Sequence, residues 1–441
     1  MSRQIIRPAR RVAGSIRVPG DKSISHRALL IAGVGEGLCR ISGLSDSEDV
    51  AATEGALASL GVAIDQTNSQ VEVQKLSTQR LDREVLVAGE GWAGLKAPSA
   101  PIYCQNSGTT ARTLLGVLAG RPITAILEGD DSLSARPMRR VIDPLVRMGA
   151  TIESAANRLP VSIRGGDLKG VDFASPIASA QVKTAVLLAG LQAEGSTSVG
   201  EPAQSRDHTE RLLEYIGVHI EKTADRLVVK ATNIRNASSL SIPGDLSSAA
   251  FLLVAAAILP SSEATVLDVG VNPTRTGILN VLRAYGADVQ ITDQRTEAGE
   301  PVATVTVRAG DRRGVDVAGA QIVATVDELP LVAVLAAFAE GETTIRDAAE
   351  LRVKESDRIA TVAEGLRALG ADVRAMDDGM TIQGGRPLTG ADVRSHGDHR
   401  IAMALAVAAL GATGETVIDG WEAVGVSYPG FLEDLESIVE R

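Results

Sequence analysis

Aromatic residues are scarce in this chain of 441 residues, where Phe, Trp and Tyr together make up only 2%. Binding of single-stranded nucleic acid by stacking bases on aromatic side chains is therefore not expected. The formal net charge of -11 is also opposite in sign to the basic surface that normally meets a phosphate backbone. The basic residues of this chain are therefore expected to matter in local clusters.

Cysteines and long hydrophobic runs are also few. The two cysteines, Cys39 and Cys104, cannot form a disulfide framework and fit a reducing compartment, so a cytoplasmic location is the expectation. The longest apolar runs, such as residues 249–259, are shorter than the roughly 18 residues that a membrane span requires, and they are interpreted as buried helices. No apolar segment of the secretory type follows the positively charged residues 1–7.

Ala, Val, Leu and Ile must build the cores, because hydrophobic residues make up 44% of the chain while aromatic residues are rare. The length suggests two or three domains. A helical run that ends in small residues and continues into a short strand recurs six times, at residues 32–37, 118–123, 189–195, 256–260, 336–341 and 409–414. A spacing of roughly seventy to eighty residues predicts one repeated α/β unit.

A second helix type lies between several of these copies and is closed by a glycine before an alternating strand. These glycines are Gly61, Gly149, Gly217, Gly286 and Gly370. Glycine is the usual residue for a left-handed helix C-cap, and the alternation indicates a strand with one buried face. Each unit is therefore expected to contain strand, helix, strand, helix and strand in some order.

Two Pro-Gly-Asp turns, at residues 19–21 and 243–245, each precede an apolar helix. They predict two crossings between domains, so that residues 1–20 and 243–441 form one domain of three units and residues 21–242 form an inserted domain of three units. Only the first turn is followed by cations, Lys22 and Arg27. Asp21 or Ser23 would cap that helix, and its free N–H groups and dipole favour an anion. An ordinary cap with a solvated first turn is the alternative.

Further polar clusters precede apolar helices at residues 105–112, 129–140, 178–183, 205–210, 326–330, 351–359 and 396–400. Each cluster alone is also compatible with ordinary capping or a solvated face, and Arg139 and Arg140 are expected on a helix surface. His396 and His399 have no further His or Cys nearby, so no metal site is expected. If the helix N-termini of both halves meet in one cleft, its charged groups are Lys22, Arg27, Arg136, Lys354, Arg358 and Arg400, with Asp327 and Glu355 for acid–base chemistry.

Several of these clusters resemble, in order along the chain, signature blocks of the 5-enolpyruvylshikimate-3-phosphate synthase family. The blocks are residues 21–27, 106–110, 136–138, 179–181, 205–209, 327–328, 352–358 and 398–400. The resemblance runs from about residue 14 to the C-terminus. It implies an α/β, two-domain enolpyruvyl transferase fold, an inside-out α/β barrel in which each domain has three βαβαββ-type units with pseudo-threefold symmetry. It also implies a cleft that closes on substrate.

The resemblance further implies the reaction, in which the enolpyruvyl group of phosphoenolpyruvate passes to the 5-hydroxyl of shikimate 3-phosphate through a tetrahedral intermediate, releasing phosphate. No metal or organic cofactor is implied, no nucleic acid or membrane is an expected partner, and a monomer is expected. Matching positions for shikimate 3-phosphate are Lys22, Ser23, Arg27, Ser179, Ala180, Gln181, Ser205, Asp327 and Lys354. Matching positions for phosphoenolpyruvate are Lys22, Gly108, Arg136, Gln181, Arg358 and Arg400.

The chemistry fits these residue types, because an alcohol near its ordinary pKa is a poor nucleophile and needs a proton acceptor. Asp327 is expected to take that proton, and Glu355 or Lys22 is expected to protonate C3 of phosphoenolpyruvate. The cations would stabilise the phosphate that leaves the intermediate. These three residues, Asp327, Glu355 and Lys22, are the expected catalytic groups.

The chain departs from many members of the family at three positions. Ala180 stands where many have Ser, Val426 where many have Lys, and Thr113 where some have Pro. The changes at Ala180 and Val426 imply one fewer phosphate hydroxyl and one fewer cation, and Thr113 bears on the degree of glyphosate sensitivity. Gly108 is the form associated with sensitivity to glyphosate, which resembles bound phosphoenolpyruvate.

The sequence disfavours two alternatives. A UDP-N-acetylglucosamine enolpyruvyl transferase would have an Asn after the first Lys and a catalytic Cys on a mobile loop, whereas Ser23 follows Lys22 here and neither cysteine lies in such a loop. A non-catalytic anion-binding scaffold is disfavoured because Asp327 and Glu355 accompany the cations.

Overall fold

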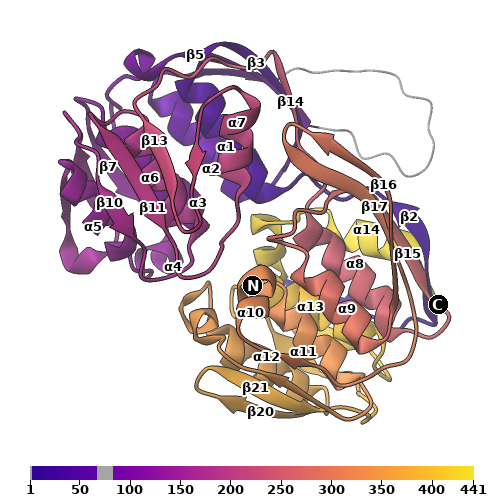
Figure 1. The fold of residues 1–441 in the computed structure, drawn as a ribbon. Helices are drawn as coiled ribbons and strands as arrows, with labels where there is room; N and C mark the ends of the chain where they lie inside the picture. The colour runs from indigo at the N-terminus through magenta and orange to yellow at the C-terminus, as the bar shows by residue number, and fades with distance from the viewer. Residues whose placement is uncertain (1, 67–82) are drawn as a thin grey trace.

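The computed structural model describes residues 2–66 and 83–441, which form two lobes (Figure 1). One hydrophobic core runs from Ile24 to Ile242, and we call this part the inserted lobe. The other core joins residues 6–18 to residues 246–438, and we call this part the terminal lobe. The chain therefore passes between the lobes twice.

The two Pro-Gly-Asp turns form these passages and lie side by side. Gly20 and Gly244 pair in antiparallel fashion. The backbone N–H of Asp21 donates to Pro243 at 2.8 Å, and that of Asp245 donates to Pro19 at 2.8 Å. A Cβ on Gly20 would lie only 1.6 Å from the carbonyl oxygen of Gly43, so the close approach requires glycine.

The inserted lobe contains three successive units. The first contains α1 (Lys22–Val34), β3 (Glu36–Leu44), α2 (Glu48–Ser59), β4 (Ala63–Gln66), β5 (Arg83–Glu90) and the short helix η1 (Trp92–Gly94), with β14 (Ser239–Ser241) returning to pair with β3. The second contains β6 (Ile102–Tyr103), α3 (Gly108–Ala119), β7 (Thr124–Glu128), α4 (Asp131–Ser134), α5 (Arg139–Met148), β8 (Thr151–Ser154), η2 (Ala155–Asn157) and β9 (Val161–Arg164). The third contains β10 (Asp172–Ala174), α6 (Ala180–Gly190), β11 (Ser196–Gly200), α7 (His208–Tyr215), β12 (Glu221–Lys222) and β13 (Leu227–Lys230).

The terminal lobe also contains three units. The first contains β2 (Arg11–Ile16), α8 (Leu246–Ile258), β15 (Glu263–Gly270), α9 (Gly277–Tyr285), β16 (Asp288–Glu297) and β17 (Glu300–Arg308). The second contains β18 (Asp316–Val317), α10 (Ala320–Thr325), α11 (Leu329–Ala337), β19 (Glu342–Ile345), η3 (Ala349–Val353), α12 (Arg358–Ala368), β20 (Asp372–Met376) and β21 (Gly379–Gln383). The third contains β22 (Asp392–Arg394), α13 (His399–Leu410), β23 (Thr416–Asp419), η4 (Trp421–Val426), α14 (Phe431–Ile438), β24 (Val439–Glu440) and β1 (Arg3–Ile6).

Among the described residues, five of the six sheets share one core strand order. The first strand of the unit is parallel to the second, and the second and third strands are both antiparallel to the fourth, as in β10-β11-β13-β12. The remaining sheet has three strands, in which β1 completes the pair β22–β23. The repeated α/β unit predicted from the sequence is confirmed.

Helix ends follow the predicted pattern. All five glycines predicted as left-handed caps have positive φ angles, between 87° at Gly61 and 116° at Gly149. The strand expected directly after Gly217 is displaced, since β12 begins only at Glu221. This strand pairs over two residues at the edge of its sheet, so little backbone pairing holds its start in place.

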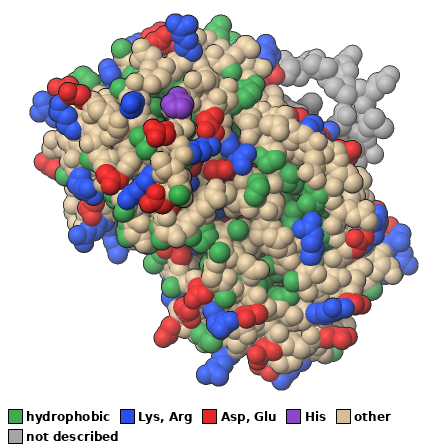
Figure 2. All heavy atoms as spheres, viewed as in Figure 1, with side chains coloured by type: hydrophobic (Ala, Val, Ile, Leu, Met, Phe, Trp, Pro, Cys, Tyr) green, Lys and Arg blue, Asp and Glu red, His purple; other side chains and the backbone are tan. Residues whose placement is uncertain are grey.

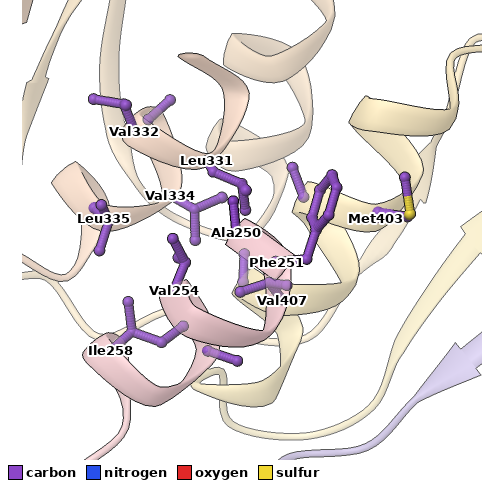
Figure 3. Close-up of a cluster of buried hydrophobic side chains, with 14 of the residues drawn as sticks. Ala250, Phe251, Val254, Ile258, Leu331, Val332, Val334, Leu335, Met403 and Val407 are labelled. Carbon is purple, nitrogen blue, oxygen red and sulfur yellow. The ribbon is translucent and has the colours of Figure 1, made fainter. Parts of the chain in front are cut away.

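Small and branched aliphatic residues allow the central helices to pack closely. In the terminal lobe α8, α11 and α13 contact one another, and Figure 3 shows Val254 of α8, Val334 of α11 and Val407 of α13 facing a shared core. Every residue of α8 is buried, as predicted for residues 249–259. In the inserted lobe a Cβ on Gly116 of α3 would lie 2.2 Å from the carbonyl oxygen of Ala185 in α6, so these helices meet nearly backbone to backbone.

The surface mixes both charge signs. On the face shown in Figure 2, Lys and Arg side chains are interspersed with Asp and Glu side chains. Large exposed hydrophobic side chains come from separate elements, including Leu38 on β3, Tyr103 on β6 and Tyr215 on α7. Within residues 2–66 and 83–441, none of the helices has the length and apolar character needed to cross a membrane.

Candidate active site

A cavity of about 450 Å³ lies between the lobes and is lined by residues of both. This size suits small-molecule ligands. The inserted lobe contributes the N-termini of α1, α3 and α6, and the terminal lobe contributes those of α12 and α13 together with the loop before α11. The predicted site residues that line it are Lys22, Ser23, Gly108, Arg136, Ser179, Ala180, Gln181, Ser205, Asp327, Lys354, Glu355, Arg358 and Arg400.

The start of α1 is capped by Asp21, whose carboxylate accepts from the N–H of Ile24 at 2.9 Å. Nζ of Lys22 lies 2.8 Å from a carboxylate oxygen of Asp49. Arg27 lies outside the cavity lining, because its buried guanidinium donates to the backbone oxygen of Ser23 at 2.8 Å and to Oγ1 of Thr209 at 2.8 Å. Arg27 therefore stabilises the first turn of α1 from outside the cavity lining.

Gly108 begins α3 and lies against the side chain of Arg112. A Cβ at this position would lie 2.6 Å from Nη1 of Arg112. The same nitrogen donates to Oε1 of Gln181 at 2.8 Å, and Nε2 of Gln181 donates to Thr109 at 2.9 Å. Burial lowers the pKa of Arg112 to about 10, with a further contribution from Arg136. The α3 N-terminus thus orients the amide of Gln181 in the cavity wall.

Ser179 and Ser205 line the cavity and share one carboxylate, Glu201. The N–H of Ser179 donates to Glu201 at 2.8 Å, and Oγ of Ser205 donates to it at 2.7 Å. Nζ of Lys183 lies 3.0 Å from Glu201 and 2.8 Å from Glu210, and all three charged side chains are buried. This buried ion network fixes the two serines.

Asp327 lies between α10 and α11 and faces cations from both lobes. These are Arg206, which donates a hydrogen bond to it, and Arg275 at 3.5 Å, Arg358 at 3.6 Å, Lys354 at 3.8 Å and Arg400 at 3.8 Å. Burial alone would raise the pKa of Asp327, but Arg206, Arg400 and Lys354 hold it well below its ordinary value. The carboxylate is therefore ionised at neutral pH.

Arg358 begins α12 and is 1% exposed. Its Nε donates to Asp398 at 2.8 Å and its Nη2 donates to Glu355 at 2.7 Å. Among the described residues, Nη1 has no hydrogen-bond partner and faces Asp327 in the cavity wall. Burial would raise the pKa of Glu355, but Arg358 and Arg136 hold it well below its ordinary value. The fork of Arg358 thus retains one donor for an anion.

The two histidines of residues 396–400 lie in different environments. His399 lines the cavity, where burial and the charge of Lys22 lower its pKa to about 3, so it is neutral at pH 7. His396 lies 3.3 Å from Glu364, and it does not line the cavity. In the part of the chain that the structure describes, no group of three or more His, Cys, Asp or Glu side chains is arranged to hold a metal ion.

Some cavity residues were not predicted from the sequence. Arg140, expected on a helix surface, lines the cavity and donates to Glu350 of the terminal lobe at 2.7 Å. Arg206 directly follows Ser205, so its motif pointed to it without revealing its role. Arg275 lies in an isolated turn, and nothing in the sequence pointed to it. Ala180 lines the cavity, whereas Val426 does not.

The chain was compared with known proteins. The model of the family "EPSP synthase (3-phosphoshikimate 1-carboxyvinyltransferase)" matches residues 6–435. The 3-phosphoshikimate 1-carboxyvinyltransferase of Desulforamulus reducens is 46% identical over 438 residues, which cover 99% of each chain. That of Geobacter metallireducens is 44% identical over 444 residues, covering 100% of each chain.

Solved structures agree with this match. The EPSP synthase of Acinetobacter baumannii superposes with a TM-score of 0.86 at 39% identity, covering 99% of this chain and 98% of that one. The enolpyruvyl transferase NikO of Streptomyces tendae superposes with a TM-score of 0.78 at 20% identity, which shows a shared fold. The fold is thus the mixed α/β enolpyruvyl transferase fold, and the resemblance stated from the motif blocks is confirmed. The chain belongs to the EPSP synthase (3-phosphoshikimate 1-carboxyvinyltransferase) family.

Proposed function

We propose that the cavity between the lobes binds shikimate 3-phosphate and phosphoenolpyruvate and transfers the enolpyruvyl group to the 5-hydroxyl of shikimate 3-phosphate, releasing phosphate. As a member of its family, the chain is an enolpyruvyl transferase of the shikimate pathway. The observation that carries the proposal is that cations of both lobes surround Asp327 and Glu355 in one cavity. Two anionic substrates need cations to bind them, and the reaction needs a carboxylate to accept a proton.

Shikimate 3-phosphate is assigned to the part of the cavity between α1, α6 and Asp327. Lys22, Ser23, Ser179, Ala180, Gln181, Ser205, Asp327 and Lys354 line this part, and Arg27 would act by holding the turn that contains Ser23. Hydroxyls and free N–H groups at helix starts favour a phosphate. Ala180 offers its backbone N–H without a hydroxyl.

Phosphoenolpyruvate is assigned to the neighbouring cations. Lys22, Arg136, Arg358 and Arg400 would bind its phosphate and carboxylate, with Gln181 between the two substrates and Gly108 leaving room at the start of α3. Arginine forks match both anion types well. Nη1 of Arg358, which makes no hydrogen bond within the described residues, supports this assignment.

Asp327 would accept the hydroxyl proton as the new C–O bond forms at C2 of phosphoenolpyruvate, while Glu355 or Lys22 protonates C3. In the present arrangement Arg358 and Arg136 keep Glu355 ionised. Glu355 must therefore be protonated before it can donate a proton. Protonation becomes possible when phosphoenolpyruvate binds these two guanidinium groups and weakens their interaction with Glu355. The tetrahedral intermediate then loses phosphate, whose charge the cations stabilise.

The finer architecture is also a proposal. We assign residues 1–20 and 243–441 to one domain and residues 21–242 to the other, each an inside-out α/β barrel of three βαβαββ-type units with pseudo-threefold symmetry. The two separate cores and the shared strand order support this division. We also propose that the protein is a cytoplasmic monomer that uses no metal or organic cofactor.

Phosphate release tests the proposed function. Purified protein should release phosphate from phosphoenolpyruvate when shikimate 3-phosphate is present. UDP-N-acetylglucosamine in place of shikimate 3-phosphate should give no release. Absence of release with the first pair, or equal release with both acceptors, would refute the assignment.

Gly108→Ala is expected to raise the inhibition constant of glyphosate and the KM for phosphoenolpyruvate by roughly tenfold. The new Cβ would lie 2.6 Å from Nη1 of Arg112, so this guanidinium must shift and its hydrogen bond to Gln181 in the cavity wall is disturbed. Overpacking of this kind costs about 1–3 kcal/mol. Steady-state kinetics with varied phosphoenolpyruvate and glyphosate measure the effect. Gly55→Ala in α2 is the control, because nothing lies within 4 Å of its added Cβ. An unchanged inhibition constant in Gly108→Ala would contradict the assignment.

A further inference from the structure

Arg275 forms part of the cavity lining, on the turn between β15 and α9, with its side chain 6% exposed. Its Nη1 is 3.5 Å from a carboxylate oxygen of Asp327. Its Nη2 donates to Oγ of Ser247 and lies 3.7 Å from Glu328 and 3.8 Å from Asp245. One guanidinium thus joins the acidic side chains at the base of the cavity.

The turn that contains Arg275 is held on its other side. Oδ1 of Asn272 accepts from the N–H of Thr274 at 2.9 Å, which shapes the turn. Nδ2 of Asn272 donates to Asp207 of the inserted lobe at 2.6 Å and to Glu300 at 3.0 Å. Arg275 is therefore anchored by a turn that is bound at the boundary of the two lobes.

The other cations that face Asp327 differ from Arg275, because substrates compete for them. Side chains of Arg206 and Lys354 are 22% and 26% exposed, and both line the cavity. Arg358 and Arg400 are assigned above to phosphoenolpyruvate. Phosphate and carboxylate groups of two substrates will draw these four cations away from Asp327. Arg275 also lines the cavity, but it is assigned to neither substrate, and its guanidinium is held by the acidic side chains and the hydroxyl named above.

We propose that Arg275 is the fixed counter-ion of Asp327, a positioning residue that keeps this carboxylate ionised and oriented while the remaining cations bind the substrates. The inference rests on the proposed role of Asp327 as proton acceptor. The charged groups around the pair are Arg206, Lys354, Arg358 and Arg400 facing Asp327, and Asp21, Asp245 and Glu328 facing Arg275. Burial by itself raises the pKa of Asp327, so the bound enzyme needs one cation that does not leave.

Arg275→Met and Arg275→Lys test the proposal, with Arg283→Met on the exposed side of α9 as the matched control. Arg275→Met should lower kcat roughly 10- to 100-fold and leave both KM values within about threefold, because Arg275 is proposed to act on the base and is assigned to neither substrate. Arg275→Lys keeps the charge and should recover part of the loss. The control should match the unsubstituted protein.

The pH profile separates this role from a merely structural one. Loss of a cation raises the pKa of Asp327, so the base becomes protonated at a higher pH. The acid limb of the kcat profile therefore moves to higher pH. The limb of kcat/KM should move less, because it reports the free enzyme, in which Arg206 and Lys354 still face Asp327. Titration with shikimate 3-phosphate gives the folded fraction, to which kcat is normalised.

An acid limb of kcat that stays in place in both variants, or a loss confined to KM, would overturn the inference. If Arg275→Met does not fold, Arg275→Lys tests the inference instead. Its single ammonium group is a weaker partner for Asp327 than the guanidinium, so the acid limb of kcat should still move in the same direction. In an Asp327→Asn background Arg275→Met should cost little more activity. Normal kcat in Asp327→Asn alone would instead refute the proton-acceptor role, so the two failures are distinct.

Discussion

Asp327→Asn is expected to lower kcat by roughly 10³-fold while both KM values stay within several-fold, since a positioned general base contributes about 10²–10⁴-fold. Asparagine keeps the volume of the side chain but cannot accept the proton of the 5-hydroxyl. Asp327 is available for this task because nearby cations hold its pKa low despite burial and so keep the carboxylate ionised. Steady-state kinetics, with calorimetric titration of shikimate 3-phosphate, separate turnover from binding.

Asp311→Asn is the control for this substitution, because Asp311 is 74% exposed and forms an ion pair with Arg313 at the surface. It should leave kcat unchanged. A loss in Asp327→Asn that is confined to affinity for shikimate 3-phosphate would make Asp327 a binding residue. The proton acceptor would then have to be sought among the other cavity groups, with Glu355 the first to test.

Arg358→Met is expected to have the largest combined effect, abolishing measurable turnover and lowering the free energy of unfolding by about 3–5 kcal/mol. The substitution leaves Asp398, which is 0% exposed, and Glu355 without their buried partner. It also removes a proposed ligand of phosphoenolpyruvate. Urea unfolding and the phosphate-release assay measure the two losses.

The stability difference should depend on pH in a defined direction. Arg358 holds the pKa values of Asp398 and Glu355 below their ordinary range. Such groups stabilise the fold above the unfolded carboxyl pKa of about 4, and this contribution is lost as the pH falls through the folded pKa. The difference in unfolding free energy between the unsubstituted protein and Arg358→Met should therefore be largest at pH 7 and become smaller at acid pH.

Arg139→Met provides the matched control for Arg358→Met. Arg139 pairs with Asp143 at 3.1 Å, but its side chain is 71% exposed, so the loss should be below about 1 kcal/mol. Equal stability losses in the two variants, or a gap that widens at acid pH, would contradict the buried-pair explanation.

The repeated unit and most of the candidate site were predictable from the sequence. Local rules determine where a helix starts at Asp21, where it ends at Gly61 or Gly149, and where an apolar run such as α8 is buried. Polar clusters at helix starts are likewise visible in one stretch of chain. Their residues reach one cavity because the starts of α1, α3, α6, α12 and α13 all line it.

The sequence by itself thus determined the repeat, the helix caps, the crossings at the two Pro-Gly-Asp turns and the family. Only the tertiary structure decided which side chains meet: Arg206 bonds Asp327 across 121 positions, Arg140 reaches Glu350 across 210, and Arg275 lies beneath Asp327. It also placed Arg27 behind the cavity wall. The physical reason is that capping and periodicity are local, whereas ion pairs between lobes depend on how two separately packed cores are set against each other.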